Sequence, residues 1–229
     1  MADGKNTPRI RIIKNGPYNV TGGVPLSAES VVCDEAGYPT GYKKIRTYPL
    51  QEHYILCRCG KSKNPPFCDG SHLAANFNGT ETARKTRHYK KYNGPTLFLR
   101  DEEELCAGMG FCDVAPGTWD MTDNSDDPEM RRHGIETANL CPSGRLIMED
   151  SETGDDLQRK YEPGIVILEE PAEGVSGPVA VRGGIVLESC EGDEYQVCEK
   201  MTLCRCGRSE NKPFCDGTHR PAGYKVQYK

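Results

Sequence analysis

Four side chains of the kind that bind metals recur with the same spacing at two places in the 229-residue chain. One copy reads CRCGKSKNPPFCDGSH and the other CRCGRSENKPFCDGTH. Three thiolates and one imidazole within 16 residues can enclose one small cation or cluster. The chain is therefore expected to fold around two metal centres. The candidate ligands are Cys57, Cys59, Cys68 and His72 in the first copy and Cys204, Cys206, Cys215 and His219 in the second.

The repeat extends to the residues before each group of cysteines. GPYNVTGGVPL begins at Gly16 and GPVAVRGGIVL begins at Gly177, so the two ends of the chain contain copies of one module. Hydrophobic residues alternate with others at residues 48–56 and 195–203, which predicts a β-strand leading into the first cysteine of each copy. The first copy is 14 residues longer between its halves, and we expect a loop insertion around residues 34–44.

Composition favours small modules over one large core. Apolar residues make up 36% and aromatic residues 7% of the chain, which also has 12 cysteines. Small units of this kind need disulfides, metals or assembly for stability. The chain has no apolar run of membrane-spanning length and no signal-peptide core near its first residues. We therefore expect a cytoplasmic protein without a membrane partner, whose cysteines bind metal rather than form disulfides.

Charge divides the chain into three parts, although its net charge is only −5. The balance is +8 in residues 1–94, −14 in residues 95–175 and +1 in residues 176–229. We predict domain boundaries at these positions, with an acidic insert between the two modules. The basic residues of the first part are scattered, and the acidic insert would repel phosphate. Nucleic acid is therefore not an expected partner.

Spacing alone leaves two kinds of metal centre open. A zinc ion bound by three Cys and one His would only staple a small domain, whereas an iron–sulfur cluster would also accept electrons. A helix start is predicted near Asp69, where backbone N–H groups would face an anionic cluster. Arg58 and Arg205 stand between ligands, where they either offset the charge of a cluster or provide surface solubility.

A resemblance favours the cluster. FCDGSH at residues 67–72 and FCDGTH at residues 214–219, each preceded by CRCG, resemble the signature of the CDGSH iron–sulfur domain family. The resemblance covers roughly residues 15–80 and 176–226. Thr218, where the signature has Ser, is the one departure and is a small residue between ligands.

Members of this family bind a 2Fe-2S cluster through three Cys and one His, so the resemblance implies two such clusters here. Single-motif members resemble intertwined dimers. A chain with two motifs is therefore expected to fold as its own pseudo-dimer and to act as a monomer with internal pseudo-two-fold symmetry. The implied ligand pairs, one pair for each iron, are Cys57 with Cys59, Cys68 with His72, Cys204 with Cys206, and Cys215 with His219.

The acidic middle part contains a second cysteine pattern. Cys106, Cys112 and Cys141, the last followed by Pro142, form a ferredoxin-like half-motif similar to divergent monocluster ferredoxins. Met109 occupies the place of the usual middle cysteine. The three thiolates would hold a 3Fe-4S cluster, or a 4Fe-4S cluster with one other ligand. Alternatively, the insert has lost its cluster and only bridges the two modules.

These patterns together predict a β-rich α+β fold. It combines two small CDGSH-type β modules, as an intramolecular pseudo-dimer, with an inserted ferredoxin-like α+β segment. In the insert we expect strands around residues 96–100 and 145–148 and a helix around residues 129–139. The remaining cysteines have no partner spacing and are expected to be ordinary reduced thiols: Cys33, Cys190 and Cys198.

The function that these features favour is a non-catalytic iron–sulfur carrier. It would pass single electrons, or whole clusters, to a redox partner or a cluster-acceptor protein. The chain has no GxGxxG, phosphate-loop or GxSxG motif, and its other histidines are isolated. The alternatives are a zinc-stapled interaction scaffold, a three-centre electron-transfer protein with a cluster in the insert, and a redox enzyme with its own turnover.

Overall fold

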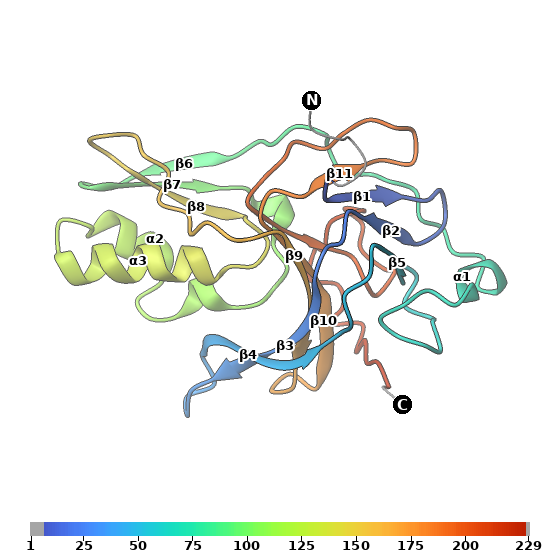
Figure 1. Cartoon of the computed structure of the whole chain (residues 1–229). Coiled ribbons are helices and arrows are strands. Elements are labelled where there is room, and N and C mark those ends of the chain that lie inside the picture. The colour runs from blue at the N-terminus through green and yellow to red at the C-terminus, as the bar shows by residue number, and fades with distance from the viewer. Residues whose placement is uncertain (1–6, 228–229) are drawn as a thin grey trace.

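The part of the chain that the computed structural model describes, residues 7–227, forms three β-sheets and a few short helices (Figure 1). The predicted β-rich α+β class is therefore confirmed. The strands are β1 (Arg9–Ile12), β2 (Tyr18–Thr21), β3 (Leu26–Cys33), β4 (Pro39–Thr47), β5 (His53–Leu56), β6 (Lys90–Asn93), β7 (Leu97–Asp101), β8 (Leu146–Asp150), β9 (Gly164–Glu170), β10 (Val175–Arg182), β11 (Val186–Glu188) and β12 (Lys200–Leu203). The helices are α1 (Ser71–Ala74), α2 (Thr118–Asp123) and α3 (Pro128–Leu140), with short 3₁₀ turns η1 (Glu103–Leu105) and η2 (Phe111–Asp113).

The two copies of the module exchange strands. One sheet has the order β11-β1-β2-β5, in which β11 comes from the second copy. The other has the order β12-β10-β9-β3-β4, in which β3 and β4 come from the first copy. The strands of different copies pair in parallel, β1 with β11 and β3 with β9. Each module sheet is therefore built from both ends of the chain.

The strand that leads into each first cysteine is shorter than the sequence predicts. Strand structure begins only at His53 in the first copy and at Lys200 in the second. The partner strands β2 and β10 end at the Gly22–Gly23 and Gly183–Gly184 turns, where all four glycines have positive φ. The residues just before His53 and Lys200 thus lie beyond the ends of these partner strands.

The predicted loop insertion around residues 34–44 is wrong in its conformation. Most of it forms β4, which pairs antiparallel with β3. The turn between them is closed by the Asp34 carboxylate, which accepts hydrogen bonds from the backbone N–H groups of Ala36 and Tyr38. β4 has exposed Lys43 and Lys44. It is an edge strand, where charged side chains are common because they discourage pairing with other molecules.

The insert has its own sheet, in the order β6-β7-β8, with α3 packed against it (Figure 1). The strands β7 and β8 and the helix α3 confirm the elements predicted there. Although the predicted boundary at residue 94/95 assigns β6 to the first module, it pairs with β7 of the insert. β9 lies before the boundary at residue 175/176 but pairs with β3 and β10. The boundaries themselves stay predictions.

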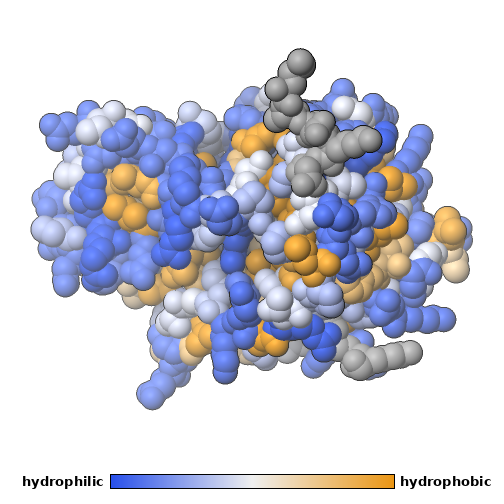
Figure 2. Space-filling view, viewed as in Figure 1, coloured by the Kyte–Doolittle hydropathy of each residue, from blue (hydrophilic) through white to orange (hydrophobic). Residues whose placement is uncertain are grey.

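The largest core cluster lies between the two module sheets. It includes Ile10 and Tyr18 from one sheet and Ile165, Val181 and Leu203 from the other. Burying side chains from both copies in one core ties the modules to each other. Figure 2 shows a face made mainly of hydrophilic residues with small, separate hydrophobic patches. Within residues 7–227, no helix has the length and apolar content needed to cross a membrane.

Candidate metal centres

The same backbone pattern positions the ligand residues of both copies. In the first copy, the Cys57 N–H donates to Pro66 O over 2.8 Å and the Cys68 N–H donates to Ile55 O over 2.9 Å. These bonds fold the loop back, so that the third cysteine returns beside the end of β5. The second copy repeats both bonds at the end of β12, from Cys204 to Pro213 and from Cys215 to Thr202, over 2.8 and 2.9 Å.

The candidate ligand atoms of each copy form two pairs. In the first copy, Cys57 Sγ lies 3.7 Å from Cys59 Sγ, and Cys68 Sγ lies 3.5 Å from His72 Nδ1. The corresponding distances in the second copy are 3.9 Å and 3.4 Å. No set of three His, Cys, Asp or Glu side chains in residues 7–227 is close enough to hold one metal ion. The structure thus brings the eight predicted residues together as four pairs, two at each site.

Hydrogen bonding favours a thiolate in each Cys-x-Cys pair. The Cys59 thiol donates to Cys57 and lowers the pKa of Cys57, and backbone N–H groups add to this effect. The same interaction with Cys204 lowers the pKa of Cys206. Thiolates are the form that binds iron or zinc, so the donor set fits a metal cluster.

The predicted helix start is confirmed only as one turn in the first copy. α1 has four residues, and the Asp69 carboxylate accepts hydrogen bonds from the N–H groups of Ser71 and Lys63. The corresponding residues of the second copy form turns without an α-helix. The expected helix contribution to anion binding is therefore small, because the dipole of one turn is small.

The two sites differ in burial. Cys57 and Cys59 are buried in the first site, but Cys68 and His72 are partly exposed. In the second site all four candidate ligands are buried, and His219 has an exposed fraction of 2%.

The second site also has a carboxylate that sequence reasoning missed. The His219 ring, through Nε2, lies 2.6 Å from Glu170 Oε1, and Glu170 is 1% exposed. Arg220 Nε donates to the other carboxylate oxygen over 2.7 Å. An Nε2–H bond to a carboxylate leaves Nδ1 as the nitrogen that faces Cys215 and can bind metal. Glu170 precedes the stretch of sequence that repeats between the two copies, which begins at Gly177 in the second copy, so the repeat does not mark it.

The arginines between the ligands are core residues, so a role in surface solubility is wrong for both. Arg58 is 1% exposed and Arg205 is 2% exposed. Arg58 donates to the carbonyls of Gly16 and Gly79 and lies over the rings of Tyr18 and Phe77. These contacts fix the backbone around the first Cys-x-Cys pair.

Arg205 has the equivalent place in the second copy. It donates to Gly177 O, the counterpart of Gly16 O, and forms a 2.8 Å ion pair with Glu169. Arg205 therefore connects the second Cys-x-Cys pair to the end of β9.

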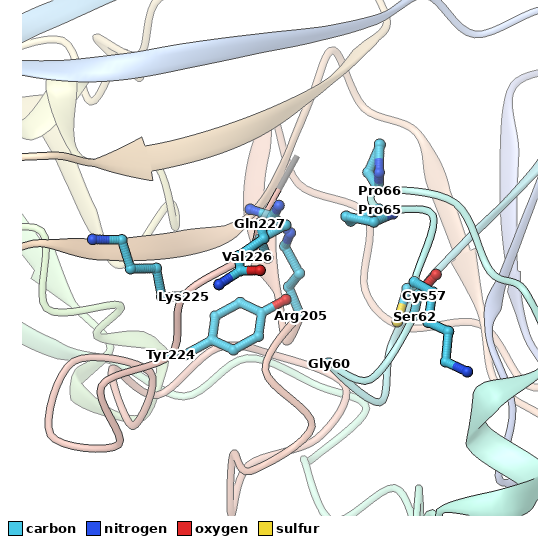
Figure 3. A pocket seen from close by; sticks show the side chains of 11 residues that line it. Cys57, Gly60, Ser62, Pro65, Pro66, Arg205, Tyr224, Lys225, Val226 and Gln227 are labelled. Atoms are coloured by element: carbon cyan, nitrogen blue, oxygen red, sulfur yellow. The ribbon is translucent and has the colours of Figure 1, made fainter. Parts of the chain in front are cut away.

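The two Cys-x-Cys loops contact each other directly. A Cβ atom on Gly60 would lie 2.6 Å from Cys206 O, and one on Gly207 would lie 2.6 Å from Cys59 O. Only glycine allows this approach, because both residues also have positive φ. A cavity of about 350 Å³ adjoins the first site, with Cys57 and Gly60 on one side and Arg205 and residues 224–227 on the other (Figure 3). The C-terminal residues of the second copy thus border the first site.

The third cysteine pattern also converges on one place. Cys106, Cys112 and Cys141 line a single cavity of about 150 Å³ in the insert. Burial raises the pKa of Cys112 to about 12. Arg145 lines the cavity and binds Asp101 through two hydrogen bonds of 2.6 and 2.9 Å. A cation beside the thiols favours their charged form, so the cavity suits a negatively charged cluster.

A buried lysine supports the third cysteine of this cavity. Lys200 of β12 is 2% exposed, and its Nζ donates to the carbonyls of Ala138 and Asn139 at the end of α3 over 3.0 and 2.9 Å. Cys141 follows α3 directly. Burial lowers the pKa of Lys200 to about 8. The second module therefore fixes the helix end that carries Cys141.

Comparison with known families agrees with this arrangement. The family model described as "Iron-binding zinc finger CDGSH type" matches residues 15–73 and 176–220. The one described as "Divergent 4Fe-4S mono-cluster" matches residues 92–151. The chain is a tandem CDGSH protein with a ferredoxin-like insert. Comparisons with curated proteins and with solved structures gave no match.

A tandem CDGSH protein of this kind is an iron–sulfur, metal-binding protein. The described cysteines are all free thiols, including Cys33, Cys190 and Cys198, which pack against the hydrophobic clusters. The residues that sequence reasoning missed are Glu170, Arg220 and Lys200. Each is a charged side chain that gains its role from a neighbour distant in sequence, so no local motif marks it.

Proposed function

We propose that this tandem CDGSH protein is a non-catalytic electron carrier with a 2Fe-2S cluster at each Cys₃His site. The observation that carries the proposal is the pairing of the candidate ligands by twos at both sites. Each iron of a 2Fe-2S cluster takes two protein ligands, whereas one tetrahedral zinc ion needs all four around a single point. The pairing thus supports the cluster over the zinc-stapled scaffold.

The chain would supply the ligands and their surroundings. Cys57 and Cys59 would hold one iron and Cys68 and His72 the other, and the second copy would repeat this set. A bound 2Fe-2S cluster accepts and releases one electron, and His ligation raises its reduction potential above that of an all-Cys cluster. The contact between Gly60 and Cys206 supports electron exchange between the two sites, because it brings the two ligand loops together without an intervening side chain.

We include a third cluster in the insert in the proposal. Three thiols that share a cavity with Arg145 support it, as does the match to a divergent 4Fe-4S family. Cys106, Cys112 and Cys141 would be its protein ligands.

The internal pseudo-dimer and the monomeric state also belong to the proposal. The reciprocal pairing of β1 with β11 and of β3 with β9 supports them, because each copy receives from the other the strand that it gives. An exchange completed within one chain leaves neither copy in need of a second molecule.

The proposed partner is an acidic redox protein that docks at the first site. Leu73, next to His72, is 74% exposed, and Lys61 and Lys63 of the ligand loop are exposed as well. An exposed apolar side chain near a ligand loop with two exposed lysines suits a negatively charged partner surface. The exposure of Cys68 and His72 supports a second candidate function, which is transfer of the whole cluster to an acceptor protein.

Iron, zinc and acid-labile sulfide per chain, measured on anaerobically purified protein, test the proposal. We expect about seven or eight iron atoms, with EPR signals from 2Fe-2S centres and from a cubane-type cluster. About four iron and four sulfide would remove the insert cluster but keep the two 2Fe-2S sites. Zinc without sulfide would overturn the electron-carrier function.

A further inference from the structure

Glu170 connects two sites that the sequence places far apart. Its buried carboxylate contacts His219, a candidate ligand of the second CDGSH site, through Oε1 and Arg220 through Oε2. The Arg220 side chain also lines the cavity formed by Cys106, Cys112 and Cys141. One carboxylate and one guanidinium thus lie between the second CDGSH site and the insert site.

The backbones of the two sites touch at the same place. A Cβ atom on Gly217, which lies between Cys215 and His219, would be 3.6 Å from Cys106 O and from Ala107 C. A Cβ atom on Gly108 would be 3.7 Å from the Gly217 Cα and from Arg220 Cδ. The insert loop therefore packs on the second ligand loop itself, and Arg220 is at the edge of this contact.

Among the residues that the structure describes, the first CDGSH site has no such connection. In the strand register, Arg9 pairs with Thr21 and Gly164 pairs with Arg182, and the repeat makes Thr21 the counterpart of Arg182. When this count is continued past the end of β1 at Ile12, Asn15, a turn residue, stands at the position of Glu170. Asn15 accepts a hydrogen bond from the Gly79 N–H.

Arg220 likewise has an uncharged counterpart. Leu73 follows His72 as Arg220 follows His219, and Leu73 is 74% exposed. The CDGSH motif itself therefore requires neither charge. The pair is present only at the copy on which the insert packs.

We propose that Glu170 and Arg220 are positioning residues that couple the second CDGSH cluster to the insert cluster electrostatically, and that the first CDGSH cluster is outside this coupling. The inference rests on the insert cluster of the proposed function. Glu170 is buried and the Arg220 side chain is 29% exposed, so water and salt screen both charges less than they screen fully exposed ones. The guanidinium favours the reduced, more negative form of each cluster, and the carboxylate of Glu170 opposes reduction at the second site.

EPR-monitored redox titration of the full-length, anaerobically purified protein tests the coupling. Arg220→Leu places the first-copy residue at this position. We expect the EPR signals of the insert cluster and of one 2Fe-2S cluster to titrate at more negative reduction potentials. Each shift should correspond to about a tenfold change in the reduction constant, ~59 mV for one electron. The other 2Fe-2S wave should stay in place. Glu170→Gln should move the 2Fe-2S wave of the second site in the opposite direction.

Opposite shifts distinguish the coupling from a merely structural role, in which both substitutions would lower iron content alike. Arg220→Lys keeps the charge and should keep the potentials near those of the unsubstituted protein. Leu73→Ala is the matched control and should move no wave. If Arg220→Leu does not fold, the other two variants test the coupling. Glu170→Gln should shift the reduction potential of the second site to more positive values, and Arg220→Lys should shift no potential.

Failure of the inference can be told from failure of the proposed function. Three sets of EPR signals whose reduction potentials are unchanged in Arg220→Leu and Glu170→Gln would overturn the coupling and leave the three-centre carrier intact. About four iron atoms per chain and no insert signal would overturn the insert cluster and the coupling together.

Discussion

The two CDGSH sites have the same ligands in the same spacing but different surroundings. At the second site, His219 is buried beside Glu170 and the insert loop covers the ligand loop. At the first site, Cys68 and His72 are partly exposed, and Leu73 is 74% exposed. The comparison teaches that the repeated motif determines which atoms can bind metal. The rest of the chain determines how firmly that metal is held and what can reach it.

The largest expected difference is in the rate of iron loss. We expect a chelator to remove iron from the first site about a hundredfold faster than from the second, because opening the second site must break two charge-assisted contacts, one buried and one partly buried, of roughly 1.5 kcal/mol or more each. The visible absorbance of the protein, followed with time after chelator addition, should fall in two phases. The insert cluster can be followed separately by EPR.

The assignment of the phases has a direct control. His72→Ala should remove the fast phase and leave the slow one unchanged, and His219→Ala should do the reverse. A single phase in the unsubstituted protein would mean that burial and Glu170 do not determine iron retention.

A smaller effect is expected from removing the carboxylate alone. Glu170→Ala should speed the slow phase about tenfold, because His219 loses a buried charge-assisted hydrogen bond while the insert loop still covers the site. Glu170→Gln keeps an acceptor for the His219 N–H and should give an intermediate rate. The matched substitution in the first copy, Asn15→Ala, should leave the slow phase as it is. An unchanged slow phase in Glu170→Ala would assign the difference between the sites to the insert loop instead.

The sequence was sufficient for the features that depend on local pattern. The spacing of cysteines and histidines predicts groups that the structure does bring together, and the sequence of the insert predicts β7, β8 and α3. The sequence was insufficient where the conformation of a segment depends on a neighbouring strand. The strand before Cys57 is short because its partner β2 ends at Thr21, and most of residues 34–44 belong to β4, which pairs with the edge of β3.

The charged residues around the sites show the same limit. Arginine is usually a surface residue, yet Arg58 is buried between two ligands, where it donates hydrogen bonds to the carbonyls of Gly16 and Gly79. Glu170 and Lys200 lie on strands of the second module and act on His219 and on the end of α3. Their roles follow from tertiary packing, which no single segment of sequence contains.

The smallest effect is expected from giving the first site only one half of the missing pair. Leu73→Arg introduces the residue found at Arg220, but the counterpart of Glu170 is Asn15, whose side-chain oxygen already accepts the Gly79 N–H. The new guanidinium would have no buried carboxylate to bind, and exposed charges contribute little because water and salt screen them. We expect the fast phase of iron loss to change by less than about twofold. Measuring both phases in Leu73→Arg and in the unsubstituted protein checks this. A tenfold slower fast phase would show that the arginine protects a site without Glu170, and the difference between the two sites would then belong to Arg220 alone.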